Sequence, residues 1–514
     1  MQMSSRELSN NKRILKNSLL LYFRMLLMLA IGLFTSRVVL EALGVEDFGL
    51  YNVVGGFVSL FTVLRSGVSS ATQRFLTFYL GTGDCYELKK TFSACFFVYL
   101  IISFFILILA ETFGTWFLNN KLSFDSARCD AAFVVFQLSL VTLILGMLST
   151  PYNALIIAHE KMGAFAYISI YEALSKLFVA YLISHSSLDR LILYAALLCV
   201  VQVSVQLVYM LYCRMKFAES KLLLSFESER IRQIYKFTGW AMIGGIASIG
   251  FTQGLNVLLN VFFSPVVNAA RGIAVQIQQV ACNFVTSFQT AVTPQIIKSY
   301  AKKDLSYMYK LIFTSSKFSY ILLFLISLPV MIDAEYILSL WLISVPKNTE
   351  LFFRLIIITS FIDALSNPFM RAVDATGNIR NYQLVVGGIL LTIVPISYIA
   401  LKLGAPPYSV FVVHIVISVL AFIVRLLMSQ KLIGISLKRY FLDVVSKLFL
   451  ITVISVTTSL YVASLIDVHF LRLLILCLIS TVSICLSTFF IGLSQDEKNL
   501  VVCKVKNIVK KGKA

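Results

Sequence analysis

Long apolar runs recur along the whole chain and are separated by short polar segments. A helix needs about 20 apolar residues to cross a bilayer, and these runs are long enough. Strand-type alternation is absent, and a backbone in lipid must close its hydrogen bonds within a helix. We therefore expect an all-α polytopic membrane protein with about 14 spans. They lie near 17–40, 48–78, 91–118, 131–157, 163–184, 190–213, 236–262, 267–297, 308–332, 351–373, 382–402, 407–430, 441–465 and 471–493.

The composition agrees with a membrane protein. The chain has 514 residues, of which 59% are hydrophobic and only 13% charged, about half the charged fraction of a soluble domain. The net charge of +19 is spread over short loops. No compact basic domain is left for nucleic acid, so we expect no nucleic-acid partner. The N-terminal stretch MQMSSRELSNNKRILKNSLL has no small-residue cleavage site, which predicts a retained first helix.

Lys and Arg are distributed unequally between the two sides. With the N-terminus placed in the cytoplasm, about 29 of the 44 Lys and Arg residues lie in cytoplasmic segments and about 6 lie outside. Positive residues in short loops favour the cytoplasmic side. Both termini are therefore predicted to be cytoplasmic, which requires an even number of spans.

The chain also carries an internal repeat. The stretches STPYNALIIAHEKMGAFAYI (149–168) and SNPFMRAVDATGNIRNYQLV (366–385) align at an offset of 217 residues, and each ends one span and begins the next. A weaker match relates 36–52 to 255–271 at an offset near 219. These offsets predict a duplicated unit of six spans.

Duplication divides the chain into an N-lobe (1–215), a C-lobe (216–435) and an appended part (436–514) with two spans and a basic tail. Because six is even, both lobes insert the same way up, around an axis along the membrane normal and with a cavity between them. Two lobes around a central cavity are typical of a transporter rather than an enzyme.

Nine Lys or Arg residues fall within or near the spans, whereas few acids do. Buried charge is costly, so it faces a partner or a wet cavity. Surplus positive charge there suits an anionic substrate such as a phosphate or pyrophosphate head group. Arg24 and Arg65 are candidates for this role. Arg271, near the outer end of its span, either lines the cavity or reaches the interface.

Other intramembrane residues suggest further roles. Asp363 is an isolated acid deep in a span and is the candidate site for a coupling proton or sodium ion. Glu172 and Lys176 are spaced to pair with each other on one helix. Pro151 and Pro368 lie within spans and bend their helices, as hinges or as static kinks.

Motifs for enzyme chemistry are missing from the sequence. It has no Gly-rich phosphate loop ending in Lys-Ser/Thr, and HEKMG (159–163) lacks the second histidine of a zinc protease motif. The small residues of GWAMIGGIASIG (239–250) lie in an apolar span, where they serve helix packing. We expect no cofactor, no metal site and no enzyme activity.

Two stretches resemble a known family. SRVVLEALGVEDFGLYNVVGGFVSLFTVL with GVSSATQRFLTFYLG resembles the first two helices of the polysaccharide (O-antigen and capsule) repeat-unit flippases, the Wzx-like members of the MOP (MATE-like) superfamily. TPYNALIIAHEKMGAFA resembles the junction of their fourth and fifth helices. The resemblance implies a MATE-like bundle of two six-helix lobes plus two C-terminal helices, in the bacterial inner membrane.

The resemblance also implies a function. Such proteins translocate undecaprenyl-pyrophosphate-linked oligosaccharides for lipopolysaccharide or capsule biosynthesis by alternating access, often coupled to H⁺ or Na⁺. Membrane lipids and other polysaccharide-assembly membrane proteins are the implied partners. Three alternatives stay open: a cation-coupled drug extruder of the same fold, a membrane-bound polysaccharide polymerase or lipid-linked glycosyltransferase, and a non-transporting scaffold.

Overall fold

The structure, a computed structural model, is helical throughout the part of the chain that it describes. It describes residues 5–59, 61–116, 128–223, 228–263, 265–342, 346–466, 468–495 and 497–498. Helix accounts for 91% of the structure, and the described residues form no strand. The predicted all-α class is confirmed.

The helices follow one another in three groups. The first comprises α1 (Ser5–Ser59), α2 (Thr62–Thr82), α3 (Cys85–Leu109), α5 (Cys129–Ala158), α6 (Met162–Ser184) and α7 (Arg190–Lys216). The second comprises α8 (Ser228–Phe262), α9 (Pro265–Ala301), α10 (Leu305–Ile332), α11 (Ala334–Trp341), α12 (Thr349–Thr376), α13 (Arg380–Leu391), α14 (Ile393–Lys402) and α15 (Ser409–Ile433). The last comprises α16 (Leu437–Tyr440), α17 (Ser446–Ala463) and α18 (His469–Ser487).

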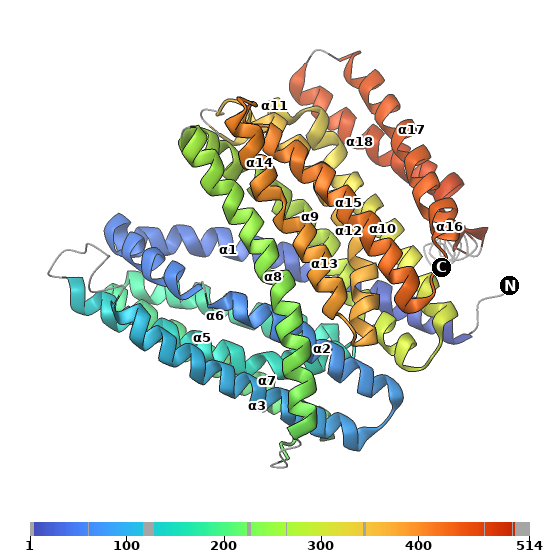
Figure 1. Ribbon diagram of the computed structural model, residues 1–514. Coiled ribbons are helices and arrows are strands. Elements are labelled where there is room, and N and C mark those ends of the chain that lie inside the picture. The colour runs from blue at the N-terminus through green and yellow to red at the C-terminus, as the bar shows by residue number, and fades with distance from the viewer. Residues whose placement is uncertain are drawn as a thin grey trace, which may run out of the picture.

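The first two groups form two lobes that meet at one end and diverge toward the other (Figure 1). The helices α17 and α18 pack on each other and on α10, at the outer edge of the second lobe. The beginning of α1 and the end of α18 lie at the end where the lobes meet (Figure 1). This arrangement is the two-lobe bundle with two additional helices that the sequence predicts.

Eleven of the described helices are long and apolar enough to cross a membrane. Three expected spans, 48–78, 267–297 and 351–373, are outside this set. Their helices, α2 with the end of α1, α9 and α12, form in the structure but carry more polar side chains. All three lie in the middle of the molecule, where α2 packs on α9 and α9 packs on α12.

The chain turns at Gly44, between the expected spans 17–40 and 48–78, and the expected spans 48–78 and 382–402 are themselves divided. Gly44 has a φ of 75° and a ψ of 173° inside α1, so the chain turns there between two helical segments. A glycine adopts this backbone conformation without the steric penalty of a Cβ. The expected span 48–78 is divided, since α1 ends at Ser59 and α2 begins at Thr62. The expected span 382–402 is likewise divided at Thr392, between α13 and α14.

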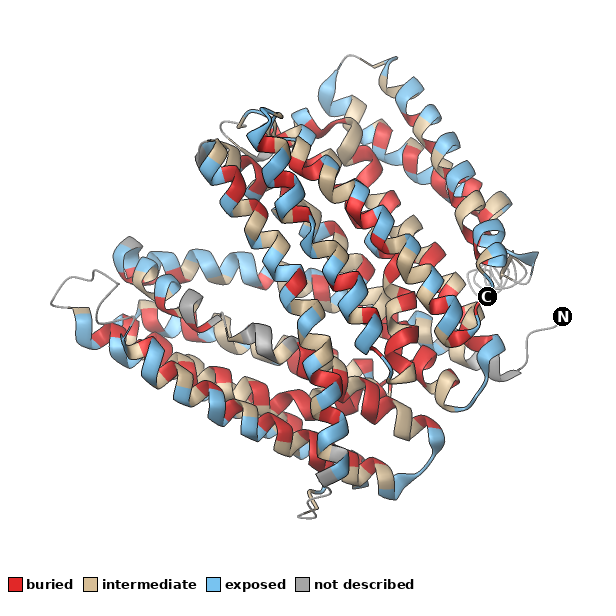
Figure 2. Cartoon of the chain, viewed as in Figure 1, coloured by how far each residue is buried: buried red, intermediate tan, exposed pale blue. Residues whose placement is uncertain are grey.

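Apolar packing joins the two lobes at the end where they meet. Phe75 of α2 packs edge-on against Phe237 of α8 at 5.7 Å between ring centroids. Gly67 of α2 lies directly against Met242 of α8, where a Cβ would stand 2.5 Å from Met242 Cγ. Figure 2 shows buried residues gathered at this junction and exposed residues along α1 beyond it.

Candidate functional site

Arg24 lies half-buried on α1 and faces α6 of the same lobe. Its Nη1 donates a hydrogen bond to Ser169 Oγ at 3.1 Å. The guanidinium carbon lies 4.4 Å from the centroid of the Phe165 ring, in cation–π contact. No ion pair of Arg24 occurs within the described residues, and its buried Nε has no hydrogen-bond partner there. The charge is therefore held in place but not neutralised.

Arg65 is the second half-buried arginine of this lobe, near the beginning of α2. Gly146 of α5 leaves room for it, because a Cβ there would stand 3.7 Å from both Arg65 Nη1 and Gln202 Nε2. Within the described part of the chain, Arg65 makes no hydrogen bond and no ion pair. Its five donors are free for a ligand.

Tyr209 of α7 brings the two arginines together. It is buried and lies within electrostatic range of both Arg24 and Arg65. Asn153 Nδ2 donates to the Tyr209 hydroxyl at 3.5 Å. The neighbouring acid, Glu172, is already paired, since Lys176 Nζ lies 2.6 Å from Glu172 Oε1. The surroundings of Tyr209 therefore keep the two guanidinium charges of Arg24 and Arg65 in excess.

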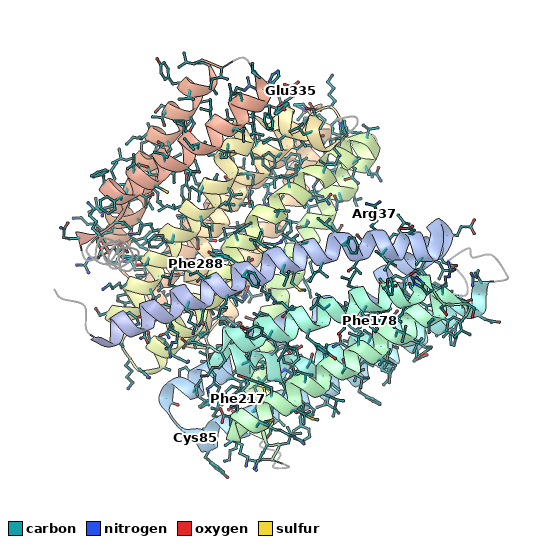
Figure 3. The ribbon with its side chains drawn as sticks, turned by 180° about the vertical axis from the view of Figure 1, so that it is seen from behind. Arg37, Cys85, Phe178, Phe217, Phe288 and Glu335 are labelled. Atoms are coloured by element: carbon teal, nitrogen blue, oxygen red, sulfur yellow. The ribbon has the colours of Figure 1, made fainter. Side chains whose placement is uncertain are left out.

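The structure does not bring Arg271 to this pair. Arg271 lies on α9, is 7% exposed, and donates to Asn256 Oδ1 and to the Thr252 carbonyl of α8. It thus ties α8 to α9 near their connection. Arg37, farther along α1 than Arg24, is exposed near the outer end of that helix (Figure 3).

Asp363 of α12 lines a separate cavity of about 370 Å³ inside the second lobe. Residues of α8, α12, α13 and α15 line most of its wall, and Ser70 of α2 closes it toward the first lobe. The carboxylate is open to the cavity and makes no hydrogen bond within the described residues. It lies within electrostatic range of Arg425, whose Nη1 donates to Ser366 Oγ at 2.7 Å.

Glu160, between α5 and α6, joins the two lobes where they meet. Its buried carboxylate accepts from Gln295 Nε2 at 2.6 Å and pairs with Lys298 Nζ at 2.6 Å, both on α9. Arg13 Nε of α1 lies 2.7 Å from the same carboxylate. Asn17 Nδ2 donates to the Glu160 carbonyl at 3.1 Å. The Glu160 carboxylate of the first lobe thus binds both α1 and α9 of the second lobe, and we call this set of contacts the clasp.

Arg74 of α2 makes the reciprocal contact. It is 8% exposed, and its Nη2 donates to the Ala375 carbonyl at the end of α12 at 3.1 Å. Its guanidinium carbon also lies 4.4 Å from the Phe75 ring, 4.9 Å from Phe78 and 5.8 Å from Phe237. This cation of the first lobe therefore rests on a helix end of the second.

The internal repeat relates these two contacts. At the offset of 217, Glu160 aligns with Gly377. Both have positive φ, 59° and 78°, where a helix ends and the chain turns into the next. Gly377 lies against the Arg74 guanidinium. In each lobe, the same loop of the repeat therefore contacts the other lobe.

Sequence reasoning missed this double contact. The signal that could have revealed it is the repeat alignment, which places Glu160 of HEKMG opposite Gly377. Beside it, burial raises the pKa of the Glu219 carboxyl, but the hydrogen bond from His159, a backbone hydrogen bond and the charge of His159 together lower that pKa below its usual value. His159 and Glu219 both belong to the first lobe and do not bridge the lobes.

Pro151 and Pro368 lie inside α5 and α12, and both are buried. Each is seven residues or more before the end of its helix. Each helix is followed by the loop that contacts the other lobe, at Glu160 after α5 and at Gly377 after α12. Their role as hinges stays a prediction.

Comparison with known proteins decides the family. A family model described as "Polysaccharide biosynthesis protein" matches residues 14–300, more than half of the chain. The chain belongs to the polysaccharide biosynthesis protein family. This match confirms the resemblance drawn from the sequence. No curated protein matches the chain.

Solved structures show the fold of this family member. A MATE transporter in the bent conformation matches with a TM-score of 0.73 and 12% identity. An outward-facing multidrug resistance MATE transporter of the MOP superfamily matches at 0.69 and 14%. A MOP superfamily transporter from Pyrococcus furiosus, described as having a binding pocket of reversed polarity, also matches at 0.69 and 14%. Each match covers 83% of this chain and 96% of the other.

The chain thus combines membership of the polysaccharide biosynthesis protein family with a fold similar to that of MATE transporters. The eleven apolar helices agree with a multi-pass membrane protein. The fold match alone says nothing of the cargo, because identities near 13% carry no substrate information.

Proposed function

We propose that this family member translocates undecaprenyl-pyrophosphate-linked oligosaccharide repeat units across the bacterial inner membrane, from the cytoplasmic to the outer leaflet. The observation that carries the proposal is the pair Arg24 and Arg65. Both guanidinium groups lie near Tyr209 and lack a carboxylate partner within the described residues. A diphosphate is the anion that such a pair suits, because guanidinium groups bind phosphate oxygens bidentately.

The arginines remove the main barrier to transfer. A diphosphate cannot pass bare through lipid, since burying an unpaired charge is prohibitive. Bound to Arg24 and Arg65 inside the first lobe, the head group is neutralised while the prenyl chain stays in lipid. The membrane potential, negative inside, favours outward movement of an anion by about 2.3 kcal/mol per charge per 100 mV.

Alternating access would use the junction between the lobes. The predicted cytoplasmic location of both termini would put the contacts of Glu160 and Arg74 on the cytoplasmic side, so that the lobes would diverge toward the outside. To admit cargo from the cytoplasm, both contacts must break. Asp363 is our candidate for the coupling proton or sodium ion, since its carboxylate faces a cavity and has no hydrogen bond in the described part.

The same fold favours one second candidate. Several solved relatives are MATE transporters, one described as a multidrug resistance transporter. A cation-coupled drug extruder needs free acids for cationic drugs. Around Tyr209 in the first lobe, however, Glu172 is paired with Lys176 and the unpaired charges are those of Arg24 and Arg65.

The test uses a strain deleted for its own copy of this transporter. Wild type, Arg24→Ala and Arg24→Lys are compared for surface glycan at equal membrane expression, with Arg37→Ala on the same helix as the matched control. We expect wild type and Arg37→Ala to restore glycan, and Arg24→Ala to lose at least tenfold. Lys rescue would show that charge suffices, whereas failure of Lys would show a need for bidentate geometry.

Two outcomes would contradict the proposal. Full function of Arg24→Ala would remove the arginine from the head-group site. A wild type that restores no glycan but raises drug resistance would favour the extruder.

A further inference from the structure

A row of uncharged polar side chains follows one face of α9. It consists of Gln276, Gln279, Asn283, Thr286 and Thr290, spaced three or four residues apart, and we call it the amide track. At 1.5 Å per residue it extends about 21 Å along the helix. Gln276, Gln279 and Thr286 are exposed, and the other two are partly exposed.

The opposite face of α9 belongs to the core of the second lobe. Ala274, Ala281 and Val285 are buried there. Gln278 Nε2 donates to Ser360 Oγ of α12 at 2.8 Å, and Gln289 Nε2 donates to Ser319 Oγ of α10 at 3.0 Å. These partly buried amides thus bind within the lobe itself, whereas the amide track points away from it.

Contacts on either side of the amide track show which way it faces. On one side, Ser287 Oγ contacts Met25 Sδ at 4.0 Å, so α1 of the other lobe borders the track. On the other side, Arg271 binds α8. The track therefore lies between α1 and α8, toward the other lobe. Facing lipid instead would leave the amides without partners in hydrocarbon, which is costly.

The amide track keeps much of its hydrogen-bonding capacity unused. Gln276 makes no hydrogen bond within the described residues. Gln279 Nε2 donates to Asn283 Oδ1 at 3.2 Å, which leaves one oxygen and several N–H groups free. The Thr286 and Thr290 hydroxyls donate to their own helix at Cys282 and Thr286, so their lone pairs can still accept.

We propose that the amide track binds the saccharide of the cargo, through hydrogen bonds between its amides and the sugar hydroxyls. The inference rests on the proposed function and deepens it, because it divides the cargo between two sites. Sugar hydroxyls both donate and accept, as side-chain amides do. An uncharged row also lets a glycan leave, since it holds the sugar without a strong charge–charge interaction.

The contact between α1 and α9 shows how the head-group site at Arg24 and the amide track lie relative to each other along the two helices. Met25, which touches Ser287, follows Arg24 directly in sequence. Arg24 therefore lies at nearly the depth of Ser287, although its side chain binds Ser169 of α6, and the track continues from that depth toward the diverging ends of the lobes. A diphosphate at Arg24 places the attached sugar along Asn283, Gln279 and Gln276.

The test measures binding of two probes to the purified full-length chain. One probe is undecaprenyl pyrophosphate, and the other is the lipid-linked repeat unit extracted from the transporter-deletion strain. The variants are the triple change Gln276→Ala/Gln279→Ala/Asn283→Ala and the single change Gln276→Ala. Gln430→Ala removes an exposed amide on α15 and is the matched control.

We expect the triple variant to lose at least tenfold in affinity for the lipid-linked repeat unit and less than twofold for undecaprenyl pyrophosphate. Gln276→Ala breaks no hydrogen bond within the described protein, so the variant should fold and still lose about two- to fivefold in affinity for the lipid-linked repeat unit alone. Unchanged affinity in both variants would overturn the assignment, as would an equal loss for both probes. A wild type that binds neither probe would instead overturn the proposed function.

Discussion

Arg65 is the residue whose surroundings most directly suggest a ligand. It is half-buried, it makes no hydrogen bond or ion pair within the described residues, and it shares Tyr209 with Arg24. A guanidinium held this way costs free energy unless water or a ligand satisfies it. The Arg74 guanidinium, by contrast, donates a hydrogen bond to a carbonyl and makes cation–π contacts with three aromatic rings.

Arg65→Ala should therefore weaken binding of undecaprenyl pyrophosphate without destabilising the fold. We expect a loss of roughly tenfold or more, the effect of about 1.5–3 kcal/mol for a hydrogen bond to a charged group. Arg65→Lys should recover part of it. Arg232→Ala, an exposed arginine of α8, is the control for net charge. Unchanged affinity in Arg65→Ala would show that this guanidinium faces water only.

At the scale of elements, the polar helices carry the candidate sites. The three expected spans outside the eleven apolar helices are those of α2, α9 and α12, which hold Arg65, the amide track and Asp363. Their polarity weakens the membrane signal because these helices face the interior rather than lipid. The remaining spans are apolar on most sides and were predictable from hydropathy alone.

The sequence predicted elements better than contacts. The spans, the repeat and the candidate arginines follow from periodicity and charge, which are local properties. The clasp around Glu160 joins residues more than a hundred positions apart, from Arg13 to Lys298, so no local pattern reveals it. The break at Gly44 falls between the expected spans 17–40 and 48–78, whereas the breaks after Ser59 and at Thr392 lie inside apolar runs and leave no signal in the hydropathy.

Glu160→Gln should open the end at which the lobes meet. Removing the carboxylate leaves the Lys298 and Arg13 charges close together without their partner, and breaking a buried pair costs about 3–5 kcal/mol. Spin labels at Asp84→Cys and Lys303→Cys, in a background without other cysteines, would report the separation. We expect the ratio of long to short distances to rise at least tenfold.

The control for this experiment is Glu219→Gln, which removes a neighbouring carboxylate that pairs within one lobe. It should leave the distances unchanged. Identical distance distributions for Glu160→Gln and wild type would show that the clasp does not hold the lobes together.

Two glycines test the reciprocal contact. Gly83 and Gly377 both have positive φ at helix ends, so alanine costs about 1–2 kcal/mol at either position. A Cβ at Gly377 would stand 2.7 Å from Arg74 Nη2, whereas nothing lies within 4 Å at Gly83. Thermal unfolding should therefore show a larger loss for Gly377→Ala, by about 1–3 kcal/mol. Equal losses would mean that Arg74 moves aside freely.

At the scale of the whole molecule, the duplication places two equivalent loops at one end of two lobes. Each loop contacts the other lobe. Glu160 forms an ion pair with Lys298, and the Ala375 carbonyl, just before Gly377, accepts a hydrogen bond from Arg74. Because both contacts lie at the same end, the lobes diverge at the other (Figure 1). The cationic pair then lies inside the first lobe, and the amide track of the second lobe faces that lobe.

The most direct test of this account reconstitutes the purified protein into vesicles with the lipid-linked repeat unit extracted from the deletion strain. Periodate, added outside, oxidises only the sugars that have reached the outer leaflet. With an internal-negative potential, wild type should transfer the inner-leaflet pool outward, whereas Arg24→Ala/Arg65→Ala should transfer at least tenfold more slowly. Equal transfer in wild type, the double variant and protein-free vesicles would contradict the central claim that these arginines carry an anionic lipid-linked glycan.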